Sequence, residues 1–73
     1  MSTNMKQISE KLKELRIDNK LSQSDIGKII NVSRVVYNRY ENDQREIPIE
    51  LLCKLADFYK VSLDYLAGRE EFY

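Results

Sequence analysis

Four side chains between residues 34 and 39 could together read the edges of DNA base pairs. On a helix that turns about 100° per residue, Arg34, Val35, Asn38 and Arg39 share one broad face. Arginine and asparagine form paired hydrogen bonds with guanine and adenine in the major groove, and a valine suits the methyl group of thymine. The pattern fits a recognition helix, but an ordinary amphipathic helix with a solvated polar face shows it too.

The opposite face of this helix is apolar enough to be buried. Val36, Tyr37 and Tyr40 lie on it, and we expect them in the core with the tyrosine hydroxyls at its edge. Ser33 can cap the first free N–H groups of the helix. The helix is therefore predicted to run from about Ser33 to Asn42.

A second short helix is predicted directly before this one. Ser22 and Asp25 have the spacing of a capping box at a helix start. Three isoleucines then follow at helical spacing and form one apolar stripe: Ile26, Ile29 and Ile30. Asn31 tolerates a positive φ and can end the helix, so residues 21–42 are predicted to form two helices joined by a tight turn.

This stretch, LSQSDIGKIINVSRVVYNRYEN, resembles the helix-turn-helix of the Cro/C1 repressor family, also called the XRE family. The residues that carry the resemblance are Ser22-Gln23, Ile26, Gly27, Asn31-Val32-Ser33, Arg39, Glu41-Asn42, Arg45, Pro48 and the terminal VSLDYLAG. It covers roughly residues 6–68. It implies an all-α fold, a compact five-helix lambda-repressor-like domain in which the second and third helices form the DNA-binding motif.

The resemblance also implies roles for individual residues. The base-reading positions of the family correspond to Arg34, Val35, Asn38 and Arg39. Contacts to the phosphate backbone are implied for Ser22, Gln23, Ser33, Asn42 and Arg45. Arg16 and Glu41 correspond to a structural ion pair, and Gly27 to a small residue where the two helices cross. Asp43 replaces the glycine that the family usually has after the recognition helix, which weakens the expected phosphate clamp.

The remaining segments read as supporting helices. Apolar residues at helical spacing predict a first helix from Met5 to about Asn19. For Lys11, on its polar side, a solvated position and a phosphate contact remain equally open. Pro48 is expected in the first turn of a fourth helix, and a fifth starts at Ser62. Residues 1–73 therefore form one domain with a core of about 5–68 and a tail of 69–73.

Composition limits the chemistry. The 73 residues include one cysteine and no histidine, so an internal disulfide, Cys/His metal sites and His-based catalysis are not expected. No nucleophile–base pair or phosphate loop is visible. We therefore expect no enzyme activity, no metal and no cofactor. No apolar run approaches the roughly 20 residues of a membrane span, and no signal-peptide pattern is present, so a cytoplasmic location is predicted.

The net charge is zero, but the charge is unevenly distributed. Residues 1–40 contain eight basic and four acidic residues, a net charge of +4, and residues 41–73 contain four basic and eight acidic residues, a net charge of −4. A basic front and an acidic back suit a duplex on one side of the domain and limit non-specific affinity.

These observations predict a sequence-specific regulator that binds double-stranded DNA, most often a repressor in the family. One recognition helix reads few base pairs, so we expect a homodimer with helices about 34 Å apart on a palindrome. The fourth and fifth helices and the tail are the candidate interface. The alternative is an antitoxin-like or other protein-interaction module in which DNA binding is secondary, and a regulatory protein partner is possible.

Overall fold

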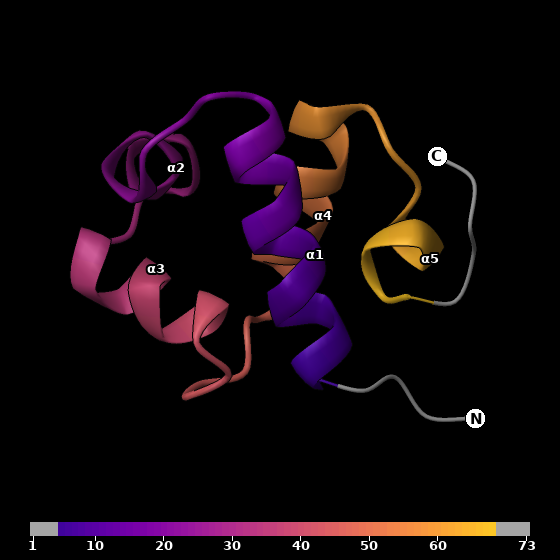
Figure 1. Ribbon diagram of the computed structural model, residues 1–73, viewed down its shortest axis with the longest axis horizontal. Helices are drawn as coiled ribbons and strands as arrows, with labels where there is room; N and C mark the ends of the chain where they lie inside the picture. Colours follow the sequence, from indigo (N-terminus) through magenta and orange to yellow (C-terminus); the bar gives the residue numbers. More distant parts are fainter. Residues whose placement is uncertain (1–4, 69–73) are drawn as a thin grey trace.

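The chain folds into five α-helices around a hydrophobic core in this computed structural model, which describes residues 5–68. The helices are α1 (Met5–Asp18), α2 (Gln23–Ile30), α3 (Arg34–Glu41), α4 (Ile49–Tyr59) and α5 (Leu63–Leu66). In Figure 1, α1 occupies the centre, α2 and α3 lie on one side of it, α5 lies on the other, and α4 passes behind. The predicted all-α, five-helix architecture is confirmed.

The core joins all five helices. Ile8, Leu12 and Leu15 from α1 are buried at the helical spacing that the sequence shows. The other helices, and the loop before α4, add Ile26, Ile30, Tyr37, Tyr40, Ile47, Leu52, Leu55, Ala56, Tyr65 and Leu66. Because α1 contacts both α3 and α5, it is the element against which the helix-turn-helix is held.

Close approach of backbone explains the glycine in α2. A Cβ atom placed on Gly27 would lie 2.7 Å from the backbone carbonyl oxygen of Val32, well inside normal contact distance. Gly27 is buried, and the Val32 N–H donates to the Gly27 oxygen at 2.8 Å. The turn therefore folds back directly onto α2, as the small residue at this position predicted.

The turn itself uses the predicted residues. Asn31 ends α2 with φ 61° and ψ 48°, in the left-handed region that asparagine tolerates better than most residues. Ser33 has an extended backbone, and its hydroxyl oxygen accepts a hydrogen bond from the Val36 N–H at 3.1 Å. Three residues, Asn31, Val32 and Ser33, thus separate α2 from α3.

Two details of the predicted helices are wrong. Ile29 was expected in one apolar stripe with Ile26 and Ile30, but it is 37% exposed, whereas the other two are buried. Pro48 was expected inside the first turn of α4, but it is the N-cap residue with φ −60° and ψ 146°. Its carbonyl oxygen accepts the N–H of Leu52, so α4 begins at Ile49.

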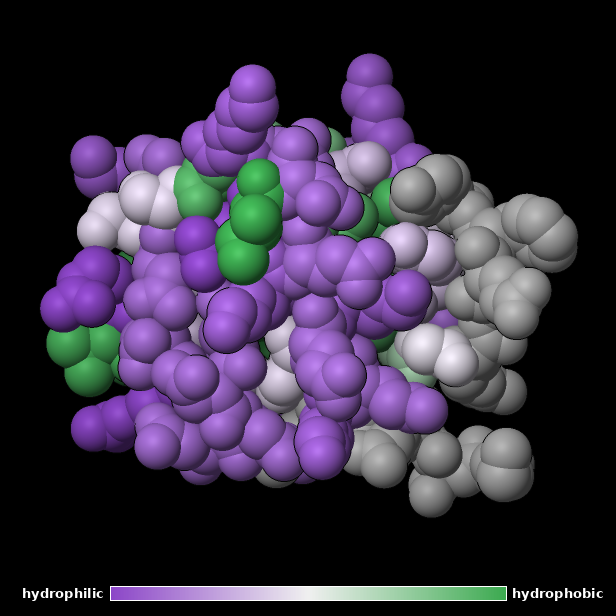
Figure 2. Space-filling view, in the orientation of Figure 1, coloured by the Kyte–Doolittle hydropathy of each residue, from purple (hydrophilic) through white to green (hydrophobic). Residues whose placement is uncertain are grey.

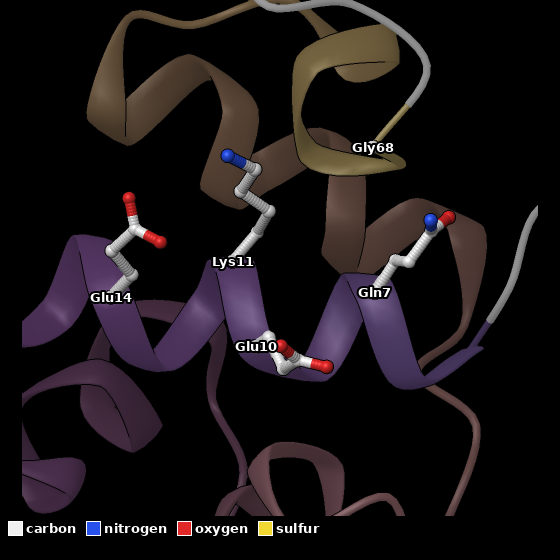
Figure 3. A pocket seen from close by; sticks show the side chains of 5 residues that line it. All are labelled: Gln7, Glu10, Lys11, Glu14 and Gly68. Carbon is white, nitrogen blue, oxygen red and sulfur yellow. The ribbon is translucent and has the colours of Figure 1, made fainter.

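Lys11 lies on the side of α1 that faces α5. Its Nζ atom is 4.5 Å from the centre of the Tyr65 ring, a cation–π arrangement. Figure 3 shows Lys11 beside an open hollow that is lined by Gln7, Glu10, Glu14 and Gly68. Since α3 lies across α1 from α5 (Figure 1), this half-buried position disfavours the phosphate contact for Lys11.

The ends of the chain are not covered by this description. The tail of residues 69–73, expected to contribute to a dimer interface, lies outside the described residues. Between residues 5 and 68, no helix is long and apolar enough to cross a membrane.

Candidate nucleic-acid interface

Three of the four predicted base-reading side chains are exposed on the outer face of α3. Arg34, Val35 and Arg39 are exposed, and Val35 is 52% exposed although it is apolar. On the inner face, Tyr37 and Tyr40 are buried at 0% and 4%. The two predicted faces of this helix are therefore present. Figure 2 shows that the molecular edge over α3 is strongly hydrophilic, interrupted by an isolated hydrophobic spot.

The start of α2 offers donors beside α3. Ser22 is its N-cap, and its hydroxyl oxygen accepts from the Asp25 N–H at 3.0 Å, while Asp25 accepts from the Ser22 N–H at 2.9 Å. The hydrogen bond from the Ser22 backbone N–H to the Asp25 carboxylate lowers the pKa of Asp25. The Ser22 hydroxyl keeps its own hydrogen as a donor, so capping and a phosphate contact are compatible. The same holds for the Ser33 hydroxyl at the start of α3.

The ion pair predicted between Arg16 and Glu41 is present and joins α1 to the end of α3. The guanidinium donates from Nε to Glu41 Oε2 at 2.7 Å and from a terminal nitrogen to Oε1 at 3.1 Å. Another Arg16 nitrogen donates to the Leu21 carbonyl at 2.8 Å. The Glu41 side chain is only 1% exposed, and its hydrogen bonds raise the pKa of Arg16.

Side-chain amides extend this ion pair toward the surface. Gln23, the first residue of α2, donates from Nε2 to Glu41 Oε1 at 3.3 Å. Asn38 donates from Nδ2 to Gln23 Oε1 at 3.0 Å. Asn42 donates from Nδ2 to Asn38 Oδ1 at 3.0 Å and to the Asn38 carbonyl at 2.9 Å. Sequence reasoning missed the two contacts of Gln23 because they join residues 15 and 18 positions apart. The contact between Asn42 and Asn38 spans four positions, and this helical spacing could have indicated it.

The loop after α3 contains the other predicted backbone contacts. Asn42 is the C-cap of α3, and Arg45 is exposed. Asp43, in the place of the family's glycine, has φ 59°, a left-handed conformation that is unfavourable for residues with a side chain. The loop therefore places one exposed basic side chain, Arg45, and two exposed acidic side chains, Asp43 and Glu46, beyond the end of α3.

The Tyr37 hydroxyl lies deeper than expected. The edge position predicted for the tyrosine hydroxyl groups is wrong for Tyr37, whose hydroxyl is fully buried. Among the described residues, neither the Tyr37 nor the Tyr59 hydroxyl has a hydrogen-bond partner in the protein. Burial, with the nearby Glu41 carboxylate, raises the pKa of Tyr37 and raises that of Tyr59 to about 12. Both hydroxyls therefore stay protonated beside the ion pair.

This surface can donate hydrogen bonds from arginine and amide groups and can offer one apolar contact. The exposed basic side chains of α2, α3 and the following loop are Lys28, Arg34, Arg39 and Arg45. Within residues 5–68, no group of three or more His, Cys, Asp or Glu residues could hold a metal ion. These side chains suit the binding of an anionic partner that forms hydrogen bonds.

Comparisons with known proteins agree with this geometry. A family model described as Helix-turn-helix matches residues 12–66. The HTH-type transcriptional regulator ImmR of Bacillus subtilis (strain 168) is 33% identical over 64 residues, which are 88% of this chain and 50% of ImmR. This chain spans about half the length of the curated relatives it matches.

Two solved structures share the fold. A transcriptional regulator from Listeria innocua superposes with a TM-score of 0.82 at 26% identity, over 90% of this chain and 62% of that one. The P22 c2 repressor protein, crystallised with a synthetic operator, superposes with a TM-score of 0.78 at 28% identity. That match covers 86% of this chain and 96% of the repressor.

Proposed function

Because this chain belongs to the helix-turn-helix family of Cro/C1-type DNA-binding transcriptional regulators, we propose that it recognises a specific operator as a homodimer and represses transcription by occupying it. A bound dimer blocks or positions RNA polymerase without a catalytic step, metal or cofactor. The proposed place of action is the cytoplasm, where bacterial DNA is accessible.

The exposed face of α3 is the observation that carries this proposal. Arg34 and Val35 lie in the first turn, the part of a recognition helix that enters the major groove most deeply. Arg39 follows one turn later on the same exposed face. We assign hydrogen bonds with guanine to Arg34 or Arg39 and contact with a thymine methyl to Val35. The P22 c2 repressor, which shares the fold, was crystallised with an operator, and this supports the assignment.

Backbone contacts are proposed for the start of α2 and for the loop. Gln23 lies in the first turn of α2, where free N–H groups and the positive end of the helix dipole favour a phosphate. Ser22, Ser33 and Arg45 are exposed and can donate to neighbouring phosphates. Contacts of this kind orient the domain on the duplex but carry no sequence information.

The homodimer is supported by apolar side chains on the helices predicted to form its interface. Ile49, Phe58 and Leu63, from α4 and α5, are 56%, 43% and 36% exposed. A symmetric dimer would place two copies of α3 about one helical turn of DNA apart, about 34 Å. This arrangement predicts a palindromic operator.

Selection from a randomised duplex DNA pool at near-physiological salt tests the proposal. Enrichment of a symmetric motif with half-sites about one helical turn apart is expected. Absence of enrichment would contradict the proposal and favour the protein-interaction alternative, which a pull-down would then test. A single half-site without symmetry would contradict the homodimer alone.

Arg39→Ala then tests whether Arg39 contacts a base or a phosphate of the DNA backbone. We expect affinity for the selected operator to fall by about 1–3 kcal/mol, with preference relaxed at one base pair per half-site. Binding to the operator and to its single-base variants measures both effects. An equal loss on every sequence would instead make Arg39 a phosphate contact.

A further inference from the structure

Three side-chain amides and one carboxylate form a single hydrogen-bonded line across the helix-turn-helix. It runs from Glu41 to Gln23 (3.3 Å), from Gln23 to Asn38 (3.0 Å) and from Asn38 to Asn42 (3.0 Å). The inner end is anchored by Arg16, which donates two hydrogen bonds to Glu41. The line therefore connects α1, the start of α2, and both the middle and the end of α3.

The direction of every hydrogen bond in the line follows from Glu41. A carboxylate that is paired with a guanidinium accepts hydrogen bonds, and the 1% exposed side chain of Glu41 accepts two from Arg16. The Gln23 amide must therefore turn its nitrogen toward Glu41 and its oxygen toward α3. Asn38 can then meet that oxygen only with its nitrogen, which leaves its own oxygen to accept from Asn42.

This arrangement conflicts with direct base reading by Asn38. Paired recognition of adenine requires the amide nitrogen and oxygen to face the base edge together. In Asn38 the nitrogen donates to Gln23 and the oxygen accepts from Asn42. Asn38 is also half-buried, whereas Arg34 and Arg39 on the same helix are exposed. A base edge would therefore compete with two hydrogen bonds that Asn38 already makes in the free protein.

We infer that Asn38 is a positioning residue of the DNA interface. Its hydrogen bond holds the Gln23 side chain against α3, and this fixes the position of the phosphate contact of α2 relative to the base contacts of α3. The inference rests on the proposed function and concerns the same site. Gln23 is the only link of the line that lies on α2, so its hydrogen bond to Asn38 couples the two helices at their DNA-facing side.

Asn42 closes the line and takes the same kind of role. Its amide nitrogen has two hydrogens and donates twice, to the carbonyl and to the side-chain oxygen of Asn38. The group left over is an acceptor oxygen, which a phosphate repels. The Asn42 side chain therefore fixes the orientation of Asn38 and is not available as a phosphate donor in this conformation.

A thermodynamic cycle on DNA binding tests the inference. Asn38→Ala is expected to weaken binding about three- to tenfold, equally on the selected operator and on all its single-base variants. In a Gln23→Ala background the same substitution is expected to add no further loss, because Asn38 acts through Gln23. Arg39→Ala, on the exposed face of α3 and outside the line, is the matched control and is expected to change base preference.

Two results would overturn the inference. Relaxed preference at one base pair in Asn38→Ala would make Asn38 a base reader. Losses that add in the double variant would show that Asn38 acts independently of Gln23. Thermal unfolding of each variant confirms that the compared proteins are folded.

A measurement without DNA keeps this test separate from the proposed function. In the NMR spectrum of the free protein, the side-chain amide signals of Gln23 are expected to shift in Asn38→Ala and not in Arg39→Ala. Unchanged Gln23 signals in Asn38→Ala would show that the line is absent in solution and would overturn the inference. A wild-type chain that binds no duplex would overturn the proposed function, while the amide signals would still report whether the line forms.

Discussion

The two helix pairs on either side of α1 are held together by different forces. The pair α2 and α3 contains a buried carboxylate, a two-pronged arginine contact and a line of amides, together with a close backbone approach at Gly27. The pair α4 and α5 relies on buried apolar side chains: Leu52, Leu55, Ala56, Tyr65 and Leu66. Directional hydrogen bonds therefore add to apolar burial in the pair α2 and α3, which also buries Ile26, Ile30, Tyr37 and Tyr40, whereas apolar burial predominates in the supporting pair.

The difference has a physical reason in what each pair must do. Apolar packing tolerates small shifts because its energy depends mainly on the area removed from water. Hydrogen bonds weaken steeply when their geometry changes, so the amide line restricts how Gln23 and α3 can move relative to each other. A surface that must match a duplex gains from that restriction, whereas a supporting pair of helices does not need it.

The largest expected effect comes from removing the anchor of the polar pair. Arg16→Ala leaves Glu41, whose side chain is 1% exposed, as a buried charge without its partner. We expect the free energy of unfolding to fall by about 3–5 kcal/mol. Urea unfolding measures this loss. Arg16→Lys keeps the charge but not the two-pronged contact, and provides a folded variant for DNA binding.

Leu55→Ala, which removes a fully buried side chain of α4, is the matched variant in the apolar pair. We expect a similar loss of stability of about 2–5 kcal/mol, but unchanged DNA affinity per folded molecule. Arg16→Lys is expected to lower that affinity. Equal DNA affinities of Arg16→Lys and Leu55→Ala would contradict the prediction that only the pair α2 and α3 depends on exact geometry for DNA binding.

Gly27→Ala probes the backbone approach inside the polar pair. Alanine normally stabilises a helix interior by about 1 kcal/mol relative to glycine, but here its methyl group would meet the Val32 carbonyl oxygen at 2.7 Å. We expect a net destabilisation of about 1–3 kcal/mol, measured by urea unfolding. Ser24→Ala, at an exposed position of the same helix, is the control and is expected to preserve or raise stability.

A smaller effect is expected from two loop residues in the left-handed region, one in each half. Asp43 after α3 has φ 59° and Lys60 after α4 has φ 57°. Glycine relieves this strain, so Asp43→Gly and Lys60→Gly are each expected to stabilise the fold by about 0.5–1 kcal/mol. Only Asp43→Gly is expected to raise DNA affinity, because it removes an acidic group beside the interface. A similar gain in affinity in Lys60→Gly would contradict the local role of Asp43.

An effect that is absent at neutral pH is expected from Tyr59, whose burial predicts alkaline destabilisation. Burial raises its pKa from 10.0 to about 12, so the folded state holds this proton more tightly than the unfolded state. Its contribution to stability is fully present below pH 10 and is lost as the pH rises toward about 12. Urea midpoints across this range are expected to fall less steeply in Tyr59→Phe than in wild type. Equal slopes would show that Tyr59 does not control this dependence.

Local features of the fold were predictable because their causes lie within a few residues. The serine caps at Ser22 and Ser33 and the left-handed Asn31 each depend on neighbours no more than four positions away. The two faces of α3 follow from helical periodicity alone. The pairing of Arg16 with Glu41 came from family resemblance, since no local rule joins residues 25 positions apart.

What the sequence by itself determined, therefore, was the set of helices, their caps and the face that α3 turns outward. Only the tertiary structure decided that Ile29 is exposed, that the Tyr37 hydroxyl is buried, and that Gln23 bonds to Asn38. Periodicity says which side chains share a face of one helix, but not how far that face is covered by another. That depends on the distances and angles at which the helices pack, which are set by all the buried side chains together.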